Sequence, residues 1–459
     1  MKSSTNLTAA KWLLALSLIF FAVVSCQKEV NHPSSQTAST SLSISDKSSG
    51  HLQQTKTFSS DGVRSWINMQ LTMQKVPLPA GTAGQATDRC QAYCGIALYE
   101  SVVPGMPAYQ SLSGQLTNFP LMPSTEPGKA YHWAASANAA LAEMNWRLFP
   151  ATSAANKTAM NNLRDSLQAI YAAETDPETL QRSIAFGKEV ATRVFNWATT
   201  DGFSNVNPPY VPPVGPGLWV PTAPTPPVGP YFYQRRLLVP GSSEGTTLAP
   251  PPAFDSTAGS AFWNMVKQVY DASLTLTVDQ KAAADYFKDI PGYTPGGSYV
   301  GIMLEALDIT KPTLDMAALT YVKVGLAQYE AGIILFTNKY QFNLIRPITY
   351  IRKYIDPAWS TYIPTPNHPE FPSGHSTTGG AVLTMMSKIF GENFHITLHF
   401  YDYLNYPSRS YTSFTQLGND ISDSRFYGGL HYRATLQKST AQGEKVAENI
   451  LAKIRFLKD

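Results

Sequence analysis

Residues 313–347 read TLDMAALTYVKVGLAQYEAGIILFTNKYQFNLIRP and carry the longest helical pattern of the chain, which we expect to span 313–345. Apolar residues recur there three and four positions apart, as on one face of a helix. Lys339 and Arg346 lie seven positions apart, so a helix would put both on the same face. Pro347 is expected to stop that helix and leave Arg346 at its end.

The surroundings of these two cations are apolar. Residues 333–336 read IILF before Lys339, and Leu344 and Ile345 precede Arg346. Two like charges on one helix face usually mark a solvated surface. Cations in apolar surroundings instead need an anion, and the arginine fork binds tetrahedral oxyanions at two points. The segment therefore predicts an anion site.

The same helical spacing recurs along most of the chain, and sustained strand alternation is nearly absent. Residues 207–230 form a Pro/Gly-rich loop that could separate two helical halves, although such loops more often wrap a surface. No fixed-period repeat is present, which argues against a solenoid. We predict an all-α fold of two packed helix bundles. The other predicted helices cover 62–76, 85–103, 130–148, 153–174, 178–201, 257–273, 277–288, 297–308, 374–390, 394–405 and 432–456.

Composition limits the function classes. The chain has 459 residues, 43% hydrophobic and 15% charged, with a formal net charge of +3. This length supports one large domain or two to three ordinary ones. With 12% aromatic residues, the chain as a whole is not of the disordered class. A net charge so close to zero implies no nucleic-acid partner, so any strongly basic site must be local.

The N-terminus has the features of an export signal. A basic start, an apolar run over 12–24 and a small residue before Cys26 are typical of a secretory signal in residues 1–25. Val-Val-Ser-Cys also resembles a bacterial lipobox, in which Cys26 would be lipidated; the alternative is an ordinary cleaved signal. Residues 26–58 are rich in Ser, Thr and Gln and are expected to form a tether to a folded domain over 59–459. We expect an outer-membrane lipoprotein, periplasmic or surface-exposed, that meets the membrane only through its lipid.

Two further cysteines, Cys90 and Cys94, lie four positions apart on a predicted helix. A disulfide between such positions would need strained geometry. No further Cys or His lies nearby to complete a zinc site. We expect both to be small buried side chains.

Two later segments carry further chemistry. Residues 368–375 read HPEFPSGH and precede an apolar helix, and Pro followed by Ser-Gly is typical of a helix start. The free backbone amides there, with the Ser373 hydroxyl, would form an anion cradle. Gly374 would let a ligand approach the main chain closely. Residues 424–431 read SRFYGGLH and add a third cation and a second histidine before the C-terminal helix.

In this order, Lys-x6-Arg-Pro (339–347), Pro-Ser-Gly-His (372–375) and Ser-Arg-x5-His (424–431) resemble the signature of one superfamily. That superfamily joins the type 2 phosphatidic acid phosphatases and the vanadium-dependent haloperoxidases. Stretches outside the motifs look like the secreted bacterial haloperoxidase branch, so the resemblance covers most of residues 60–459. It implies all-α helical bundles of the vanadium haloperoxidase/acid phosphatase type, with the motifs in 339–435.

The resemblance also implies the roles of the site residues. The bound oxyanion would be vanadate or phosphate. His431 would be the vanadium ligand, or the nucleophile that attacks phosphorus. His375 would be the acid–base residue. The oxyanion would be held by Lys339, Arg346, Ser373, Gly374 and Arg425.

Two reactions fit this resemblance. A haloperoxidase would oxidise iodide or bromide with hydrogen peroxide to a hypohalous species that attacks an organic acceptor. An acid phosphatase would hydrolyse a phosphate ester through a phosphohistidine. The phosphatase pattern places an Asp four residues after His431, where this chain has Thr435. A missing carboxylate would weaken a nucleophilic histidine, whereas a vanadium ligand could be held by a backbone carbonyl.

We therefore favour the haloperoxidase. A third hypothesis is a binding lipoprotein that keeps the fold without the chemistry. The presence of all seven site residues argues against it.

His368 and Phe336 are the predicted halide pocket. His368 stands where bromoperoxidases have a similar residue, and Phe336, three positions before Lys339, would line the same cavity. The alternatives are a surface histidine in a Pro-rich loop and a core phenylalanine. We favour iodide or bromide. His395 and His399 lie four apart and could face a metal as a pair, but they lack an obvious third ligand, so we favour a plain helix face.

Overall fold

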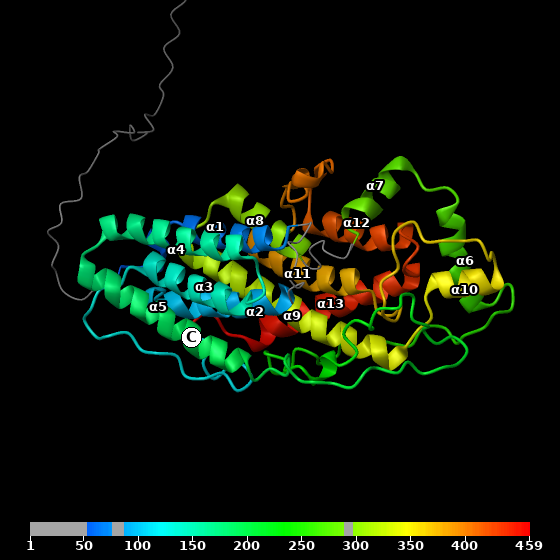
Figure 1. Cartoon of the computed structure of the whole chain (residues 1–459), viewed down its shortest axis with the longest axis horizontal. Coiled ribbons are helices and arrows are strands. Elements are labelled where there is room, and N and C mark those ends of the chain that lie inside the picture. Colours follow the sequence, from blue (N-terminus) through cyan, green and yellow to red (C-terminus); the bar gives the residue numbers. More distant parts are fainter. Residues whose placement is uncertain (1–52, 76–86, 289–296) are drawn as a thin grey trace, which may run out of the picture. The chain divides into compact units, whose positions relative to one another are not determined.

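Helix α9 (Leu314–Phe342) forms the middle of the fold in this computed structural model, which describes residues 53–75, 87–288 and 297–459. Almost every side chain of α9 from Leu314 to Leu335 is buried. Helices α2 (Thr87–Val102) and α11 (Gly374–Phe390) pack along it (Figure 1). A helix that is apolar on all sides must be covered on all sides. The predicted long helix is confirmed as the central element.

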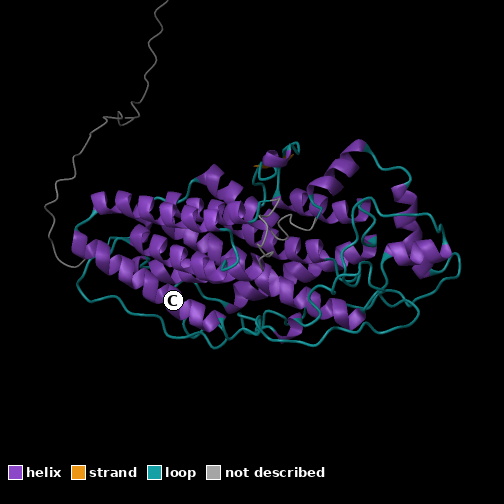
Figure 2. Cartoon of the chain, viewed as in Figure 1, coloured by secondary structure: helices purple, strands orange, loops and turns teal. Residues whose placement is uncertain are grey.

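The described residues form thirteen α-helices and one two-stranded sheet, so the predicted all-α class is confirmed (Figure 2). The remaining helices are α1 (Asp61–Met73), α3 (Trp133–Leu148), α4 (Ala154–Glu174), α5 (Pro177–Ala198), α6 (Ala261–Ser273), α7 (Val278–Tyr286), α8 (Gly297–Thr310), α10 (Pro347–Tyr354), α12 (Phe414–Tyr427) and α13 (Arg433–Lys453). Short 3-10 turns cover Thr55–Thr57, Val103–Gly105, Phe232–Gln234 and Asp402–Leu404.

The helices form two groups that share α9. In the first group, α3 packs against α2, α4 and α5, and α1 packs against α3. In the second, α11 packs against α12 and α13. Since α9 contacts both α2 and α11, the two groups have a common element. The described residues accordingly fall within a single compact unit, Ser49–Asp459.

Small residues allow α2 to approach α9 closely. A Cβ atom at Gly95 would lie 2.8 Å from the Tyr321 carbonyl oxygen, and one at Gly325 would lie 2.9 Å from that of Gln91. Neither position leaves room for a side chain. On the same helix, Cys90 and Cys94 are buried free thiols, which confirms their predicted role.

Residues 394–405, predicted as a helix, are not helical. They contain β1 (Ile396–Leu398), which pairs antiparallel with β2 (Arg409–Tyr411), and then the turn at Asp402–Leu404. Ile396 and Leu398 are buried and Thr397 is less so, which is the period of a strand. In so short an apolar segment, periodicity alone does not separate the two structures.

Two helices, α10 and α12, were not among the predictions. Pro347 begins α10 rather than ending α9, because the first position of a helix does not need the N–H that proline lacks. Helix α12 is capped by Ser413, whose side chain accepts the N–H of Gln416. Its buried positions include Ser422, Ser424 and Arg425, which weakens the apolar pattern.

The Pro/Gly-rich loop 207–230 wraps the end of α9. The Trp219 N–H donates to the Asn343 carbonyl oxygen at 2.7 Å. The Val228 N–H donates to the Asn367 carbonyl oxygen at 3.0 Å. The loop therefore follows a surface, the more common of its two predicted roles.

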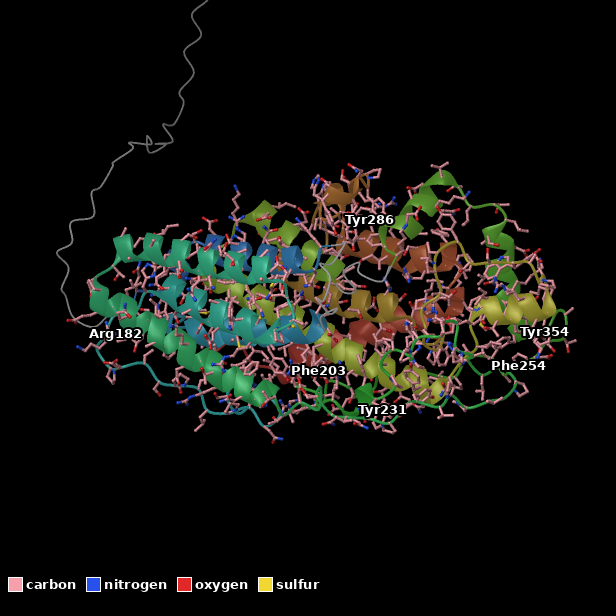
Figure 3. The ribbon with its side chains drawn as sticks, in the orientation of Figure 1. Arg182, Phe203, Tyr231, Phe254, Tyr286 and Tyr354 are labelled. Carbon is pink, nitrogen blue, oxygen red and sulfur yellow. The ribbon has the colours of Figure 1, made fainter. Side chains whose placement is uncertain are left out.

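A second apolar cluster lies beside the segment that follows α9. Phe262 of α6 packs its ring 5.4 Å from Tyr350 of α10 and 6.1 Å from Tyr432 (centroid distances). Phe254 and Tyr354 add a ring pair at 6.1 Å (Figure 3). The Tyr432 hydroxyl donates to the Ile345 carbonyl oxygen at 3.0 Å. This cluster thus fixes the immediate neighbours of Arg346 and His431.

The predicted signal, Cys26 and most of the predicted tether lie outside the described residues. Thr55, near the end of the predicted tether, is fully buried, and its hydroxyl donates to the Val102 carbonyl oxygen at 2.8 Å. Across the described part of the chain, none of the helices is both long and apolar enough to traverse a membrane.

Candidate active site

The two cations of the first motif lie on opposite sides of a bend. Helix α9 ends after Lys339, and Asn343 takes the left-handed conformation (φ 44°) that turns the chain. Arg346 then precedes α10 in extended conformation. The expectation that one helix carries both residues is wrong. Their side chains nevertheless converge, because the bend directs the chain back toward the same site.

Lys339 is fully buried and surrounded by carbonyl oxygens. Its Nζ donates to the oxygens of Pro369 at 3.0 Å and Glu370 at 3.2 Å, and also to that of Pro372. Burial, followed by the charge of Arg346, lowers the pKa of Lys339 well below its usual range. An anion beside the ammonium group would counter both effects.

Arg346 is also fully buried and joins three segments. Its Nε donates to the His368 carbonyl oxygen at 2.9 Å, and Nη1 donates to that of Leu430 at 3.0 Å. Nη2 lies 2.9 Å from His368 Nδ1, and Nη1 lies 3.4 Å from His431 Nε2. A guanidinium only donates, so both imidazole nitrogens must accept. Burial lowers the pKa of Arg346 to about 10, which leaves it charged at neutral pH.

Ser373, Gly374 and His375 open helix α11. The Ser373 side chain caps the helix by accepting the Ser376 N–H at 3.4 Å and its hydroxyl at 3.1 Å. Neither contact uses the hydroxyl hydrogen of Ser373. A Cβ atom at Gly374 would approach only Leu335 Cδ1, at 3.9 Å, so open space adjoins the main chain there. The predicted anion cradle would lie at this helix N-terminus.

His375 is more accessible than His431, because it is only partly buried. Its carbonyl oxygen accepts the Tyr299 hydroxyl at 2.7 Å, which ties the first turn of α11 to α8. An accessible imidazole beside an anion cradle can exchange protons with solvent and with a bound ligand.

Arg425 and His431 come from the end of α12 and the turn before α13. Arg425 is 1% exposed, and its Nη1 donates to the Phe287 carbonyl oxygen at 2.7 Å. Its charge contributes to the lowered pKa values of both Lys339 and His431. Gly429, with φ at 79°, lets the chain reverse between α12 and His431.

One residue of this site was missed by the sequence analysis. Glu370 is fully buried, and its Oε1 lies 2.9 Å from His431 Nδ1. Its Oε2 accepts the Thr435 hydroxyl at 2.9 Å. The expectation that His431 lacks a carboxylate partner is therefore wrong: the carboxylate comes from the loop before α11. The available signal was an acidic residue inside the apolar segment HPEFP, between two motifs.

The electrostatics of the site favour an anion. The site contains three buried cations (Lys339, Arg346 and Arg425) and one buried carboxylate, Glu370. Burial raises the pKa of Glu370 to about 7, and the charge of Arg346 opposes that rise. Burial and the neighbouring cations lower the pKa of His431 well below its usual range, so its imidazole is neutral.

The two predicted halide-pocket residues lie together. The rings of His368 and Phe336 meet edge to face, with centroids 5.5 Å apart. Phe336 also contacts Phe232, at 4.6 Å between centroids. His368 is therefore not a surface histidine: it bonds Arg346, and burial lowers its pKa well below the usual range.

His395 and His399 do not form a metal pair on a helix, because their segment is not helical. His399 Nδ1 instead pairs with Asp402 Oδ2 at 2.9 Å on the surface. Among the residues that the structure describes, no group of three or more His, Cys, Asp or Glu side chains could hold a metal ion.

The donor set suits vanadate. A metal oxyanion needs several positive charges around its oxygens and one neutral nitrogen for the metal. Lys339, Arg346 and Arg425 supply the positive charges, and the Ser373 hydroxyl and the backbone amides of α11 add hydrogen-bond donors. His431 Nε2 supplies the neutral nitrogen, and at Gly374 no side chain crowds the main chain within 3.9 Å of an added Cβ position.

The chain matches one protein-family model and several solved structures. The family description "VCPO second helical-bundle domain" matches residues 319–458, which contain every predicted oxyanion-binding residue. The chain is similar to the solved structure of a bacterial vanadium-dependent iodoperoxidase, with 28% identity, a TM-score of 0.77, and coverage of 88% of this chain and 98% of that one.

Two bacterial vanadium-dependent chloroperoxidase structures share the fold at lower identity. The holo form has 18% identity and a TM-score of 0.59, covering 79% of this chain and 91% of its own. The apo form has 17% identity and a TM-score of 0.62, covering 83% of this chain and 96% of its own. Comparison with curated proteins gives no match.

Proposed function

We propose that the chain is a member of the vanadium-dependent haloperoxidase family and that it acts as a vanadate-dependent haloperoxidase on iodide or bromide. Hydrogen peroxide, a halide ion and a proton would be converted to a hypohalous acid and water. The hypohalous acid would then react with an organic acceptor. The observation that carries this proposal is the cluster of three buried cations around the neutral His431.

Each residue has a task in this reaction. When bound, vanadate supplies a Lewis-acidic centre that activates hydrogen peroxide. Lys339, Arg346 and Arg425 neutralise oxygen charge in a site with little water, where fixed charges act strongly. His431 Nε2 serves as the metal ligand. His375, the more accessible imidazole, accepts a proton from peroxide and returns one to the leaving oxygen.

We propose iodide as the preferred halide. Iodide is the most easily oxidised of the candidate ions, and the similar solved structure at 28% identity is that of an iodoperoxidase. The edge of the Phe336 ring beside His368 offers a polarisable surface for a large soft anion.

The first test uses protein stripped of metal and then reloaded with orthovanadate. We expect peroxide-dependent formation of triiodide that requires vanadate and that disappears in His431→Ala. His399→Ala serves as the matched control, because this imidazole is exposed on the surface and should leave the rate unchanged. Absence of halide oxidation in vanadate-loaded protein would contradict the proposal.

Phosphate-ester hydrolysis is the second candidate, and Glu370 favours it. A carboxylate on His431 Nδ1 raises the basicity of the ring and fixes its tautomer, as a nucleophilic histidine needs. The same preparation without vanadate should be assayed with p-nitrophenyl phosphate. Hydrolysis that vanadate inhibits, without triiodide formation, would make the protein a phosphatase.

We also propose that Cys26 carries a lipid that anchors the protein to the outer membrane. The proposal rests on the apolar run before the Val-Val-Ser-Cys sequence. Cells given labelled palmitate should incorporate the label into the wild-type protein and not into Cys26→Ser. Equal labelling of both would contradict the anchor.

A further inference from the structure

The Glu370 carboxylate is hydrogen-bonded through both oxygens. Oε1 accepts the Tyr432 N–H at 3.0 Å and lies 2.9 Å from His431 Nδ1, while Oε2 accepts the Thr435 hydroxyl at 2.9 Å. Two of these donors belong to the start of α13, so the orientation of the carboxylate is fixed by that helix. An oxygen that accepts a backbone N–H offers its second lone pair to the imidazole. His431 Nδ1 must then carry the ring proton.

The opposite side of the ring requires the same tautomer. His431 Nε2 lies 3.4 Å from Arg346 Nη1, a group that can only donate. Nε2 therefore presents its lone pair to the cation cluster. Two independent contacts, one at each nitrogen, agree on a single protonation state with Nδ1–H and a free Nε2 pair.

The backbone of Glu370 links the same residue to the rest of the site. Its N–H donates to the Leu344 carbonyl oxygen at 3.0 Å, and its carbonyl oxygen accepts Lys339 Nζ at 3.2 Å. Glu370 thus touches the end of α9, the segment before Arg346 and the start of α13. Its position is set by the elements that hold the oxyanion-binding residues.

We propose that Glu370 is the positioning residue of His431, with Thr435 as the donor that orients its carboxylate. A carboxylate on the second ring nitrogen orients a ligating imidazole and raises its basicity. This chain supplies the group from the loop before α11, in place of the Asp expected at position 435. The inference rests on the proposed vanadate site, because it concerns how His431 is prepared for the metal.

The contact between Thr435 and Glu370 suggests a test in which the carboxylate is moved from position 370 to position 435. Thr435 Oγ1 lies 2.9 Å from Glu370 Oε2, so a carboxylate at 435 would enter the space that Glu370→Ala vacates. We expect Glu370→Ala to weaken vanadate binding ten- to hundredfold. Adding Thr435→Asp to that variant should recover most of the loss. Glu370→Gln keeps the shape and the acceptor but loses the charge, so it should give an intermediate affinity.

Vanadate affinity would be measured by equilibrium dialysis on the metal-free full chain, with thermal unfolding of each variant. The matched control is Glu330→Gln, a fully buried carboxylate that accepts from Leu238 and Ser242 instead. It should leave vanadate affinity unchanged. Affinity within twofold of wild type in Glu370→Ala and Glu370→Gln, or an equal loss in Glu330→Gln, would overturn the inference.

Nitrogen-15 NMR of labelled histidines gives a second readout that needs no vanadate. Metal-free wild type should show His431 as the Nδ1–H tautomer, and Glu370→Ala should show a mixture. An unchanged tautomer in Glu370→Ala would overturn the positioning role. Failure of wild type to bind vanadate, with the tautomer shift still present, would instead contradict only the proposed function.

Discussion

At the scale of single residues, the site depends on hydrogen bonds that no sequence spacing specifies. Glu370 and His431 are 61 residues apart, and their contact exists because the loop before α11 packs against the start of α13. The carboxylate expected at position 435 is absent, but the chemical requirement concerns only a negative charge near Nδ1. The Thr435 hydroxyl instead donates a hydrogen bond to the Glu370 carboxylate.

Arg346 shows why the residue type matters as much as the charge. Its three nitrogens contact two carbonyl oxygens and two imidazole nitrogens. A lysine offers a single point charge and could not satisfy all four acceptors. The fork therefore holds both His368 and His431 with their lone pairs directed at it.

A buried carboxylate outside the site predicts how stability depends on pH. Glu330 is fully buried, accepts the Leu238 N–H at 2.6 Å, and has its pKa raised by burial to about 7 from a normal 4.5. Between pH 4.5 and 7 the folded state keeps this proton and the unfolded state does not, so stability falls as pH rises. The slope from this group is on the order of 1 kcal/mol per pH unit.

We therefore expect Glu330→Gln to flatten the decline of the melting temperature between pH 5 and 7. Melting temperatures of both proteins across this range, at constant ionic strength, would measure the effect. Parallel curves for the two proteins would show that Glu330 is ionised in the fold throughout.

At the scale of elements, the site depends on how closely α11 and α13 approach. Gly443 of α13 faces the backbone of α11, where an added Cβ would overlap the Thr377 carbonyl oxygen and lie 2.7 Å from the Ala381 nitrogen. Farther along the same helix pair, the Ser373 N–H donates to Ser439 Oγ at 2.8 Å. Separation of the two helices would therefore displace the anion cradle.

Gly443→Ala should cost about 1–3 kcal/mol of stability, because the clash is with backbone that cannot rotate away. Gly418→Ala in α12 is the matched control. Its Cβ would approach only the flexible end of Leu383, at 3.2 Å, so we expect little change or a small gain in stability. Urea unfolding of both variants would test this. A loss in Gly443→Ala no larger than in Gly418→Ala would contradict the close crossing.

The end of α9 shows where local rules lead to the wrong element. Proline is disfavoured inside a helix, so Pro347 after an apolar helical stretch indicates a helix end. The same residue is favoured at a first helical position, which is where the structure uses it. The bend at Asn343 decides between these two uses, and the bend is stabilised by the wrapping loop through Trp219.

At the scale of the whole folded unit, Ser49–Asp459, the net charge is small, and buried positive charges are gathered at one site. The formal net charge of the chain is only +3, yet Lys339, Arg346 and Arg425 are all buried at one site. Burying three cations costs free energy that the single Glu370 charge only partly offsets. A bound oxyanion would offset part of the free-energy cost of burying the three cations.

The sequence by itself determined the all-α class and most helix positions, and it predicted the residues of an oxyanion site. Helical periodicity is a local property, and the motifs combine short spacings with side chains whose chemistry is specific to anions. Only the tertiary structure decided the bend that separates Lys339 from Arg346, the strand pair at Ile396–Leu398, the contact of His368 with Phe336, and the Glu370 partner of His431. These depend on packing between segments far apart in the chain, where many residues could meet and the shape of the helix groups selects which ones do.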